Sequence, residues 1–277
     1  MTGFPVTIVP SGGYPVTDTD GAAPAQEVES GGYPITLVEA GGLPLKVERV
    51  AGGGAGAGIT YVGGKTAVAT AGAGTTTVSL TNLTGGSDAA PQAGDVVVVG
   101  YSIGSNVDID VSVTGYVEVA DLLSTDTFRE NLGIYYKVMG GTPDTSLTLG
   151  ATTNANFGGV CAIQVWRGVD TTNVLDVAAQ TATGADSRRA NPPSITPTTS
   201  GAVIVAIGGT TAYGVVFQTP SDLENWLTAL AGTAYNNPIG MGSKAWTGGA
   251  FDPVEFGVNT DSTSSCWAAA TIALRPA

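Results

Sequence analysis

Apolar and polar positions alternate in short runs after residue 58, and this pattern predicts β-strands rather than helices. The runs are rich in Val, Ile, Thr and aromatic residues, and Gly, Pro, Asn and Ser separate them, as is typical of strands and turns. Residues 96–99 are four consecutive valines, which indicates a strand that is buried on both faces or lies in a sandwich core. The expected strands cover residues 59–62, 67–70, 76–80, 95–103, 109–113, 116–122, 131–138, 146–149, 159–167, 202–208, 256–259 and 265–274. We therefore expect residues 59–277 to form an all-β domain, a jelly-roll-like antiparallel β-sandwich.

One segment, residues 220–231, carries a signal for the start of a helix. Ser221 is placed to cap a helix, and Glu224 three residues later would complete a capping box. The segment is short, and a strand that carries Trp226 fits it equally well. A helix and a strand both remain open here.

Residues 3–49 form a repeat in which prolines stand at positions 5, 15, 24, 34 and 44. An aromatic residue or Leu precedes the proline in four of these five units, and apolar or β-branched residues follow it in the same units. Proline is tolerated at the first position of a strand, and the Gly pairs between most units suit tight turns. Each unit therefore predicts a short strand and a turn, except the unit around Pro24, which we expect to be a loop or a degenerate repeat.

Strands this short bury very little surface alone, so repeats of this kind gain a core only by stacking or by packing on a partner. We expect residues 1–50 to form an extended short-strand arm that anchors to a partner or trimerises, and residues 51–58 to be a Gly/Ala linker. The alternative is a flexible Gly/Pro-rich tail. The residues expected to anchor the arm are Phe4, Pro5, Tyr14, Pro15, Tyr33, Pro34, Leu43 and Pro44.

The charge of the chain argues against two classes of partner. Only 12% of the residues are charged and the net charge is −13, so binding to nucleic acid through neutralisation of phosphates is not expected. The same acidity weakens binding to an anionic bilayer. No apolar run is long enough to span a membrane, and the N-terminus lacks the charged and apolar regions of a signal peptide, so we expect neither membrane insertion nor a signal peptide.

The residue types for most enzyme chemistry are missing. The chain has no His, which removes the usual general base, the Ser–His and Cys–His pairs and the commonest ligand of transition metals. Its two cysteines, Cys161 and Cys266, each lie in an apolar run, where two buried free thiols are favoured over a disulfide. The glycines of residues 51–58 lack the Lys-Ser/Thr of a phosphate-binding loop. We expect a protein that is not an enzyme and needs no cofactor.

Carboxylates offer weaker candidates. Asp108 and Asp110 are two residues apart, so on a strand they share one face and would suit Ca²⁺ if a loop carbonyl joined them; a solvated strand edge is favoured over such a site. Two of the acidic residues could also form the carboxylate pair of a glycoside hydrolase, but the sequence does not identify which two. Arg167 and Asp170 flank a turn, and an ion pair that fixes the turn is favoured over a ligand role.

Four tryptophans divide into two groups. Trp166 and Trp267 lie in strand runs and are expected in the core. Trp226 and Trp246 lie in loop-rich sequence, where they would belong to the core or to a subunit interface, or else stack on sugar rings if exposed.

Four motifs in the body resemble a β-sandwich domain that is common in tailed-bacteriophage structural proteins and in some bacterial surface proteins. They are QAGDVVV at residues 92–98, LGIYYKV at 132–138, AIQVWRGVD at 162–170 and CWAAATIALRP at 266–276. The resemblance covers roughly residues 75–277. The N-terminal repeats separately resemble the GGxPVTVV tracts at the start of some phage head-fibre and decoration proteins.

The resemblance implies a virion surface protein of the head-fibre or decoration type, with capsid or other virion proteins as partners and host surface glycans as possible contacts. It also implies a homotrimer, because fibres and spikes usually have that symmetry. A tail fibre or receptor-binding protein is the first alternative, and a glycan-active enzyme module is the second.

Overall fold

The structure is a computed structural model in which residues 36–38, 46–48, 58–72, 74–125, 129–151, 158–211, 215–231, 237–258 and 265–277 are described. The chain divides into two units, Met1–Ala57 and Gly58–Ala277. This division falls inside the Gly/Ala segment at residues 51–58 that was expected to be a linker. All the elements described in either unit are strands.

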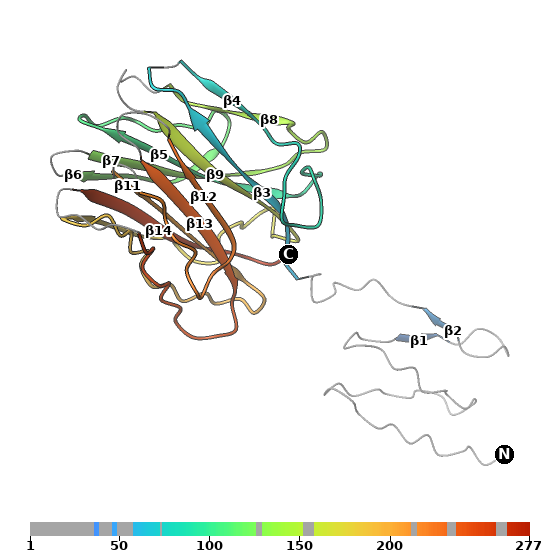
Figure 1. The fold of residues 1–277 in the computed structure, drawn as a ribbon. Coiled ribbons are helices and arrows are strands. Elements are labelled where there is room, and N and C mark those ends of the chain that lie inside the picture. The colour runs from blue at the N-terminus through green and yellow to red at the C-terminus, as the bar shows by residue number, and fades with distance from the viewer. Residues whose placement is uncertain are drawn as a thin grey trace, which may run out of the picture. The chain divides into compact units, whose positions relative to one another are not determined.

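The second unit contains two five-stranded antiparallel sheets (Figure 1). The first sheet has the order β3 (Thr60–Ala69), β9 (Gly159–Arg167), β5 (Val96–Ser105), β7 (Arg129–Val138) and β6 (Val117–Thr125). The second sheet has the order β10 (Gln180–Ala185), β14 (Cys266–Leu274), β11 (Val203–Thr210), β13 (Pro238–Ala245) and β12 (Glu224–Leu230). A separate pair is formed by β4 (Thr76–Ser79) and β8 (Ser146–Leu149).

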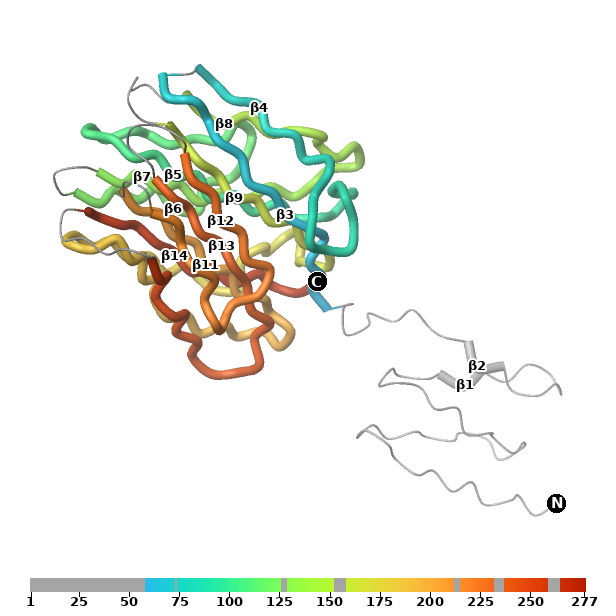
Figure 2. Tube along the Cα trace, in the orientation of Figure 1, coloured from blue at the N-terminus to red at the C-terminus, as the bar shows by residue number. Residues whose placement is uncertain are grey.

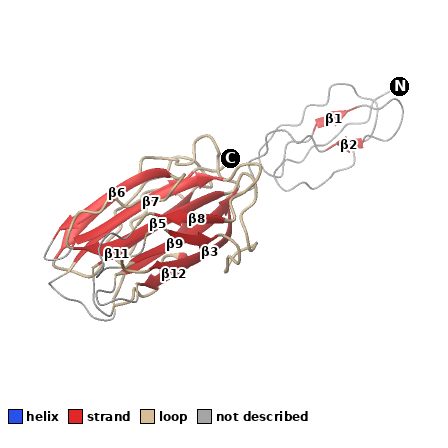
Figure 3. Ribbon diagram, turned by 90° about the horizontal axis from the view of Figure 1, so that it is seen from above, coloured by secondary structure: helices blue, strands red, loops and turns tan. Residues whose placement is uncertain are grey.

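The two sheets face each other, and each takes its strands from one half of the unit, as the colours of Figure 2 show. Central strand β5 faces β11 and β13, while β3 faces β12 at one edge and β6 faces β10 at the other. Figure 3 shows the two layers from above. The predicted all-β antiparallel sandwich is therefore confirmed.

The valine run at the start of β5 is buried on both of its faces. Val96 and Val98 point into the apolar layer between the sheets, and Val97 and Val99 point into a second apolar cluster outside the first sheet. The β4–β8 pair and the segment at residues 106–113 contribute Val78, Leu147, Leu149, Ile109, Val111 and Val113 to that outer cluster. The side chains of β5 point alternately to its two faces, as in any strand. The run is continuously hydrophobic in the sequence because both faces are covered.

The outer face of the second sheet is covered in the same way by irregular segments. Phe217, Leu223 and Phe256 pack over Ala206 and Ala269. A neighbouring small cluster contains Ile195, Ile204 and Ala273. The small residues of β11 and β14 allow these covering segments to approach the sheet closely.

Most of the predicted strands are present. Residues 59–62 and 67–70 belong to one continuous strand, β3, and the prediction for residues 159–167 coincides with β9. Residues 220–231 contain strand β12 rather than a helix. Strands β10 and β13 were not predicted, because their sequences QTATGA and PIGMGSKA are rich in small residues and lack a hydrophobic alternation.

Two predicted strands are wrong. Residues 109–113 alternate between buried and exposed positions as a strand would, but the N–H of Ile109 donates to the Asn131 side chain at 2.9 Å, and only Val113 makes an isolated bridge. Residues 256–258 likewise make single backbone contacts, to Ala190 and Gln218, and an isolated bridge at Val258. Both segments cover a sheet instead of extending one.

The predicted ion pair between Arg167 and Asp170 is also wrong. The guanidinium of Arg167 binds Asp95 in a two-pronged contact, with Nε 2.9 Å from Oδ1 and Nη2 3.0 Å from Oδ2. Asp95 is 1% exposed, so this contact fixes the start of β5 to the end of β9. Asp170 instead accepts hydrogen bonds from the backbone N–H groups of Thr172 and Asn173, which lower its pKa.

The chain enters and leaves the sandwich at the same end. Thr60 at the start of β3 pairs with Arg167 at the end of β9, and the N–H of the last residue, Ala277, donates to the carbonyl of Gly168 at 2.9 Å. We call this the entry end. The opposite end, where β7, β9, β13 and β14 begin, is called the far end.

The centre of the sandwich predicts a strong response to one methyl group. A Cβ on Gly100 of β5 would lie 2.7 Å from Ile207 Cγ2 and 3.2 Å from Ile239 Cδ1. We expect Gly100→Ala to lower the free energy of unfolding by about 1–3 kcal/mol, because it overpacks the core. Urea titration measures this, and the matched control is Gly140→Ala, where an added Cβ has nothing within 4 Å. Equal stability of the two variants would contradict the described packing.

Candidate functional site

The anchoring residues predicted for the arm lie outside the described residues. This applies to Phe4, Pro5, Tyr14, Pro15, Tyr33, Pro34, Leu43 and Pro44. The described part of the arm is strand β1 (Thr36–Val38), which pairs antiparallel with β2 (Lys46–Glu48). The central partners, Leu37 and Val47, occupy equivalent positions three residues after the prolines of two consecutive repeats. Two adjacent repeats therefore pair with each other through their equivalent strands.

Asp108 and Asp110 do not lie on a strand, so the predicted strand face does not exist. Both side chains are exposed on either side of buried Ile109. The Asn131 side chain and the hydroxyl of Tyr135, which donates to the carbonyl of Val111, hold this segment against β7.

The two aspartates nevertheless contribute to a local acidic field. The pKa of Asp121 on β6 is raised to about 6, first by burial and then by Glu118, Asp110 and Asp108. In the described part of the chain, no group of three or more Cys, Asp or Glu residues is arranged to hold a metal ion.

Trp226 is part of an aromatic cluster on the second sheet. Its ring meets Phe256 edge-on, with centroids 4.9 Å apart and planes at 85°. Gly240 and Gly242 of β13 make room for it, since a Cβ on either would lie within 3 Å of the ring. The ring is half-buried, and its Nε1 makes no hydrogen bond within the described residues.

Trp246 lies beyond the end of β13 and is also half-buried. Its Nε1 donates to the carbonyl of Gly249 at 2.8 Å, and the ring packs beside Ile195 and Ile204. The structure therefore does not join Trp226 and Trp246 into one platform, since they pack against different clusters. Trp166 is buried, as expected, and Trp267 is half-buried.

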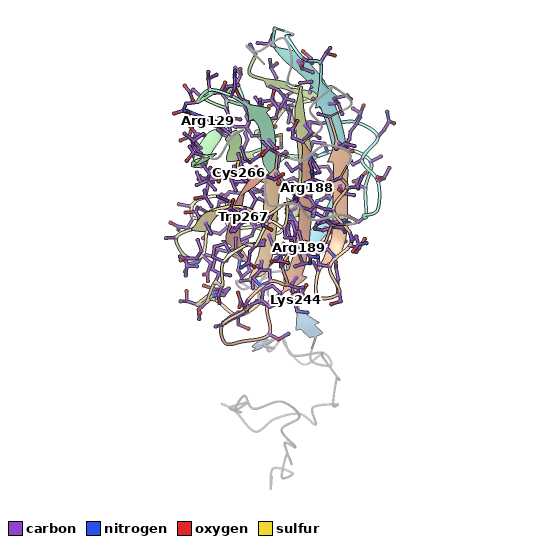
Figure 4. The ribbon with its side chains drawn as sticks, turned by 60° about the vertical axis from the view of Figure 1, so that its left-hand side comes forward. Arg129, Arg188, Arg189, Lys244, Cys266 and Trp267 are labelled. Atoms are coloured by element: carbon purple, nitrogen blue, oxygen red, sulfur yellow. The ribbon has the colours of Figure 1, made fainter. Side chains whose placement is uncertain are left out.

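Both cysteines are buried thiols outside any disulfide, as predicted. Burial raises the pKa of Cys161 to about 12, so this thiol stays neutral. Cys266 begins β14, and Figure 4 shows it toward the same end as Arg129, away from Lys244. Its Sγ lies 3.3 Å from Thr211 Oγ1.

The most unusual group of side chains was not predicted from the sequence. Five polar residues, which we call the polar seam, lie at the far end on β5, β7, β14 and the segments after β11 and before β13. They are Ser102, Glu130, Thr211, Asn237 and Cys266. Ser102 Oγ donates to Glu130 Oε1 at 2.6 Å, and Asn237 Nδ2 donates to Ser102 Oγ at 3.2 Å. The polar seam extends the layer between the two sheets toward the far end, with polar side chains in place of apolar ones.

Glu130 supplies the carboxyl group at the centre of this seam, and it is fully buried. Its pKa is raised to about 8 by burial, against which the Ser102 hydroxyl acts only in part. Oε2 makes no hydrogen bond among the described residues, and neither does Asn237 Oδ1. Glu130 is therefore a neutral carboxylic acid at neutral pH, and one of its oxygens has no hydrogen-bond partner among the described residues.

Gly209 of β11 is the residue that admits this carboxyl group. A Cβ there would lie 2.4 Å from Glu130 Oε1 and 2.8 Å from Ser102 Oγ. The only sequence signal for the seam is this glycine pair, Gly208-Gly209, in an otherwise apolar strand. Glu130 itself stands between Arg129 and Asn131, where it looks like an exposed residue at a strand end.

No protein-family model, curated protein or solved structure matches the chain. In the described part of the chain, no helix is long and apolar enough to cross a membrane.

The buried acid predicts a specific pH dependence of stability. The unfolded chain releases the Glu130 proton near its ordinary pKa of 4.5, whereas the folded chain holds it up to about pH 8. Between these values the folded state binds more protons, so the contribution of Glu130 lowers the free energy of unfolding as pH rises, by at most about 1.4 kcal/mol per pH unit. We expect Glu130→Gln to remove this dependence of the free energy of unfolding on pH. Urea titration between pH 4.5 and about pH 8 measures it.

The matched control is Asp121→Asn. Asp121 is only partly buried. Its raised pKa of about 6 limits its effect on the free energy of unfolding to the acidic part of this pH range. Cys266 is the titratable neighbour of Glu130, and its raised pKa keeps it neutral throughout. A Glu130→Gln variant with the pH slope of the wild type would show that the carboxyl is not the titrating group.

Proposed function

We propose that this chain is a non-enzymatic structural protein of a bacteriophage particle surface, of the head-fibre or decoration type. In this proposal the N-terminal arm anchors the protein to capsid or other virion proteins, and the sandwich projects from the particle. The observation that carries the proposal is the division of the chain into a repeat unit and a sandwich that covers its own faces.

The pairing in the arm supports an anchoring role. Strands β1 and β2 are three residues each, and an isolated two-stranded sheet is at best marginally stable in water. Within the described residues, β1 and β2 pair only with each other, so the outer edges of both strands are available there to further strands. A partner that adds a strand at an open edge would supply main-chain hydrogen bonds.

The sandwich supports a projecting role. Both outer faces are covered by segments of the same chain, so the sandwich needs no second protein to bury its core. The arm joins it at the entry end, through Gly58. The far end and the sides are then free to meet the host surface. Trp226, on the outer face of the second sheet, remains a candidate glycan contact. Trp246 also remains a candidate, but it lies toward the entry end, beside Ala202. Trimerisation through the arm also remains part of the proposal.

The proposal is tested by truncation of the arm. We expect a variant without residues 1–50 to fail to decorate particles that lack the protein, because the attachment strands are gone. The same variant should melt cooperatively near the temperature of the full chain, because the sandwich keeps its core. Binding is measured by co-sedimentation with the particles, and melting by circular dichroism.

A second truncation provides the control. Removal of residues 1–30 leaves the repeats that contain β1 and β2, so it should retain part of the binding. Electron microscopy of decorated particles then distinguishes attachment to the head from attachment to the tail. Normal decoration by the variant without residues 1–50 would refute an anchoring arm.

A further inference from the structure

Three side chains of the polar seam meet in an arrangement suited to a chemical reaction. Ser102 Oγ donates a 2.6 Å hydrogen bond to Glu130 Oε1 and accepts a 3.2 Å hydrogen bond from Asn237 Nδ2. Asn237 Nδ2 also donates to the carbonyl of Ser102 at 3.1 Å. A hydroxyl, a carboxyl and a carboxamide are therefore in direct contact, with the hydroxyl in the middle.

The surroundings of these three groups exclude bulk water. Ser102 and Glu130 are fully buried, and Asn237 is 1% exposed. The groups come from both sheets, because Ser102 and Glu130 lie on β5 and β7 of the first sheet and Asn237 immediately precedes β13 of the second. Hydrolysis of a bond formed here would be slow, since water cannot readily reach it.

We propose that Ser102 and Asn237 form an intramolecular ester bond, with release of ammonia and with Glu130 as the group that transfers the protons. Ser102 Oγ attacks Asn237 Cγ, the carbon that is bonded to Nδ2. The Oγ–Cγ bond forms and the Cγ–Nδ2 bond breaks, and Oδ1 becomes the ester carbonyl oxygen. The reaction involves no oxidation or reduction, and its only co-product is ammonia.

Glu130 can take a proton and give one in the same event because it has two oxygens with different roles. Oε1 accepts the proton that leaves Ser102 Oγ. Oε2 makes no hydrogen bond within the described residues, so it is the oxygen available to carry the acid proton, which passes to the departing Nδ2. Glu130 ends the reaction neutral, as it began. Its raised pKa keeps the acid proton in place at neutral pH, which this double transfer requires.

The residue after Asn237 protects it from the commonest competing reaction. Asparagine usually loses ammonia when the N–H of the next residue attacks the side chain, but the next residue here is Pro238, which has no N–H. Any loss of ammonia at Asn237 would therefore need a different nucleophile. Ser102 is the hydroxyl in contact with that amide.

The product would join the two sheets covalently. The bond connects residues that are 135 positions apart in the sequence, across the inner face of the sandwich. It would prevent the sheets from separating at the far end, in the region where the apolar layer is replaced by polar groups.

Intact-mass spectrometry of the purified full chain tests the proposal directly. We expect a mass below that of the 277-residue sequence by one ammonia, and a proteolytic product in which the peptides of Ser102 and Asn237 are joined. Hydroxylamine at alkaline pH should separate these peptides, because it cleaves esters. A folded protein that keeps its full sequence mass after prolonged incubation would overturn the proposal.

Variants identify the groups that react. Ser102→Ala and Glu130→Gln should both restore the full sequence mass, the first by removing the nucleophile and the second by removing the acid. The matched control is Ser105→Ala, which removes another buried hydroxyl from β5 and should keep the loss of ammonia. Circular dichroism establishes that each variant is folded. Persistence of the mass loss in folded Ser102→Ala would also overturn the assignment of Ser102 as the nucleophile. If Ser102→Ala does not fold, the masses of Glu130→Gln and of the wild type still decide whether the ester forms.

Discussion

Strand β5 has to be buried on both of its faces, and the other elements of the sandwich are arranged around that requirement. Its even-numbered residues Val96, Val98 and Gly100 face the second sheet, and its odd-numbered residues face the outer cluster. Covering the outer cluster requires the β4–β8 pair and the segment at residues 106–113. Polar side chains such as Asn131 and Tyr135 then supply the hydrogen bonds that hold this cover in place. The fold is therefore more than two stacked sheets, since other segments of the chain cover the outer face of each sheet.

The sequence predicts the apolar strands well because burial on both faces leaves a dense hydrophobic signal. Residues 96–99 and 159–167 show this directly. Prediction fails where the packing depends on small residues, as in β13, whose Gly240 and Gly242 are needed to accommodate Trp226. It also fails where a covering segment alternates like a strand, as residues 109–113 do, because periodicity reports burial and not hydrogen bonding.

Prediction of the candidate sites is limited in a similar way, because the residues that meet in them are far apart in the sequence. Arg167 and Asp170 are neighbours in the sequence, but the bidentate partner of Arg167 is Asp95, which is 72 positions away. The polar seam depends on three strands and two connecting segments that meet only in the folded chain. Nothing in the local sequence of Glu130 distinguishes it from a solvated residue, so its burial could not be predicted. The neutral state of this acid follows from its surroundings, because burial disfavours the charged form of a carboxyl group.

The position of the chain entry has a mechanical consequence. Tension applied at Gly58 and resisted at the far end would act along β3, which runs the length of the first sheet beside β9. The hydrogen bonds between these two strands would then bear the load together, in shear, instead of breaking one after another as in a zipper. A sandwich that is tethered at one end and pulled at the other is in this respect loaded in its stronger direction.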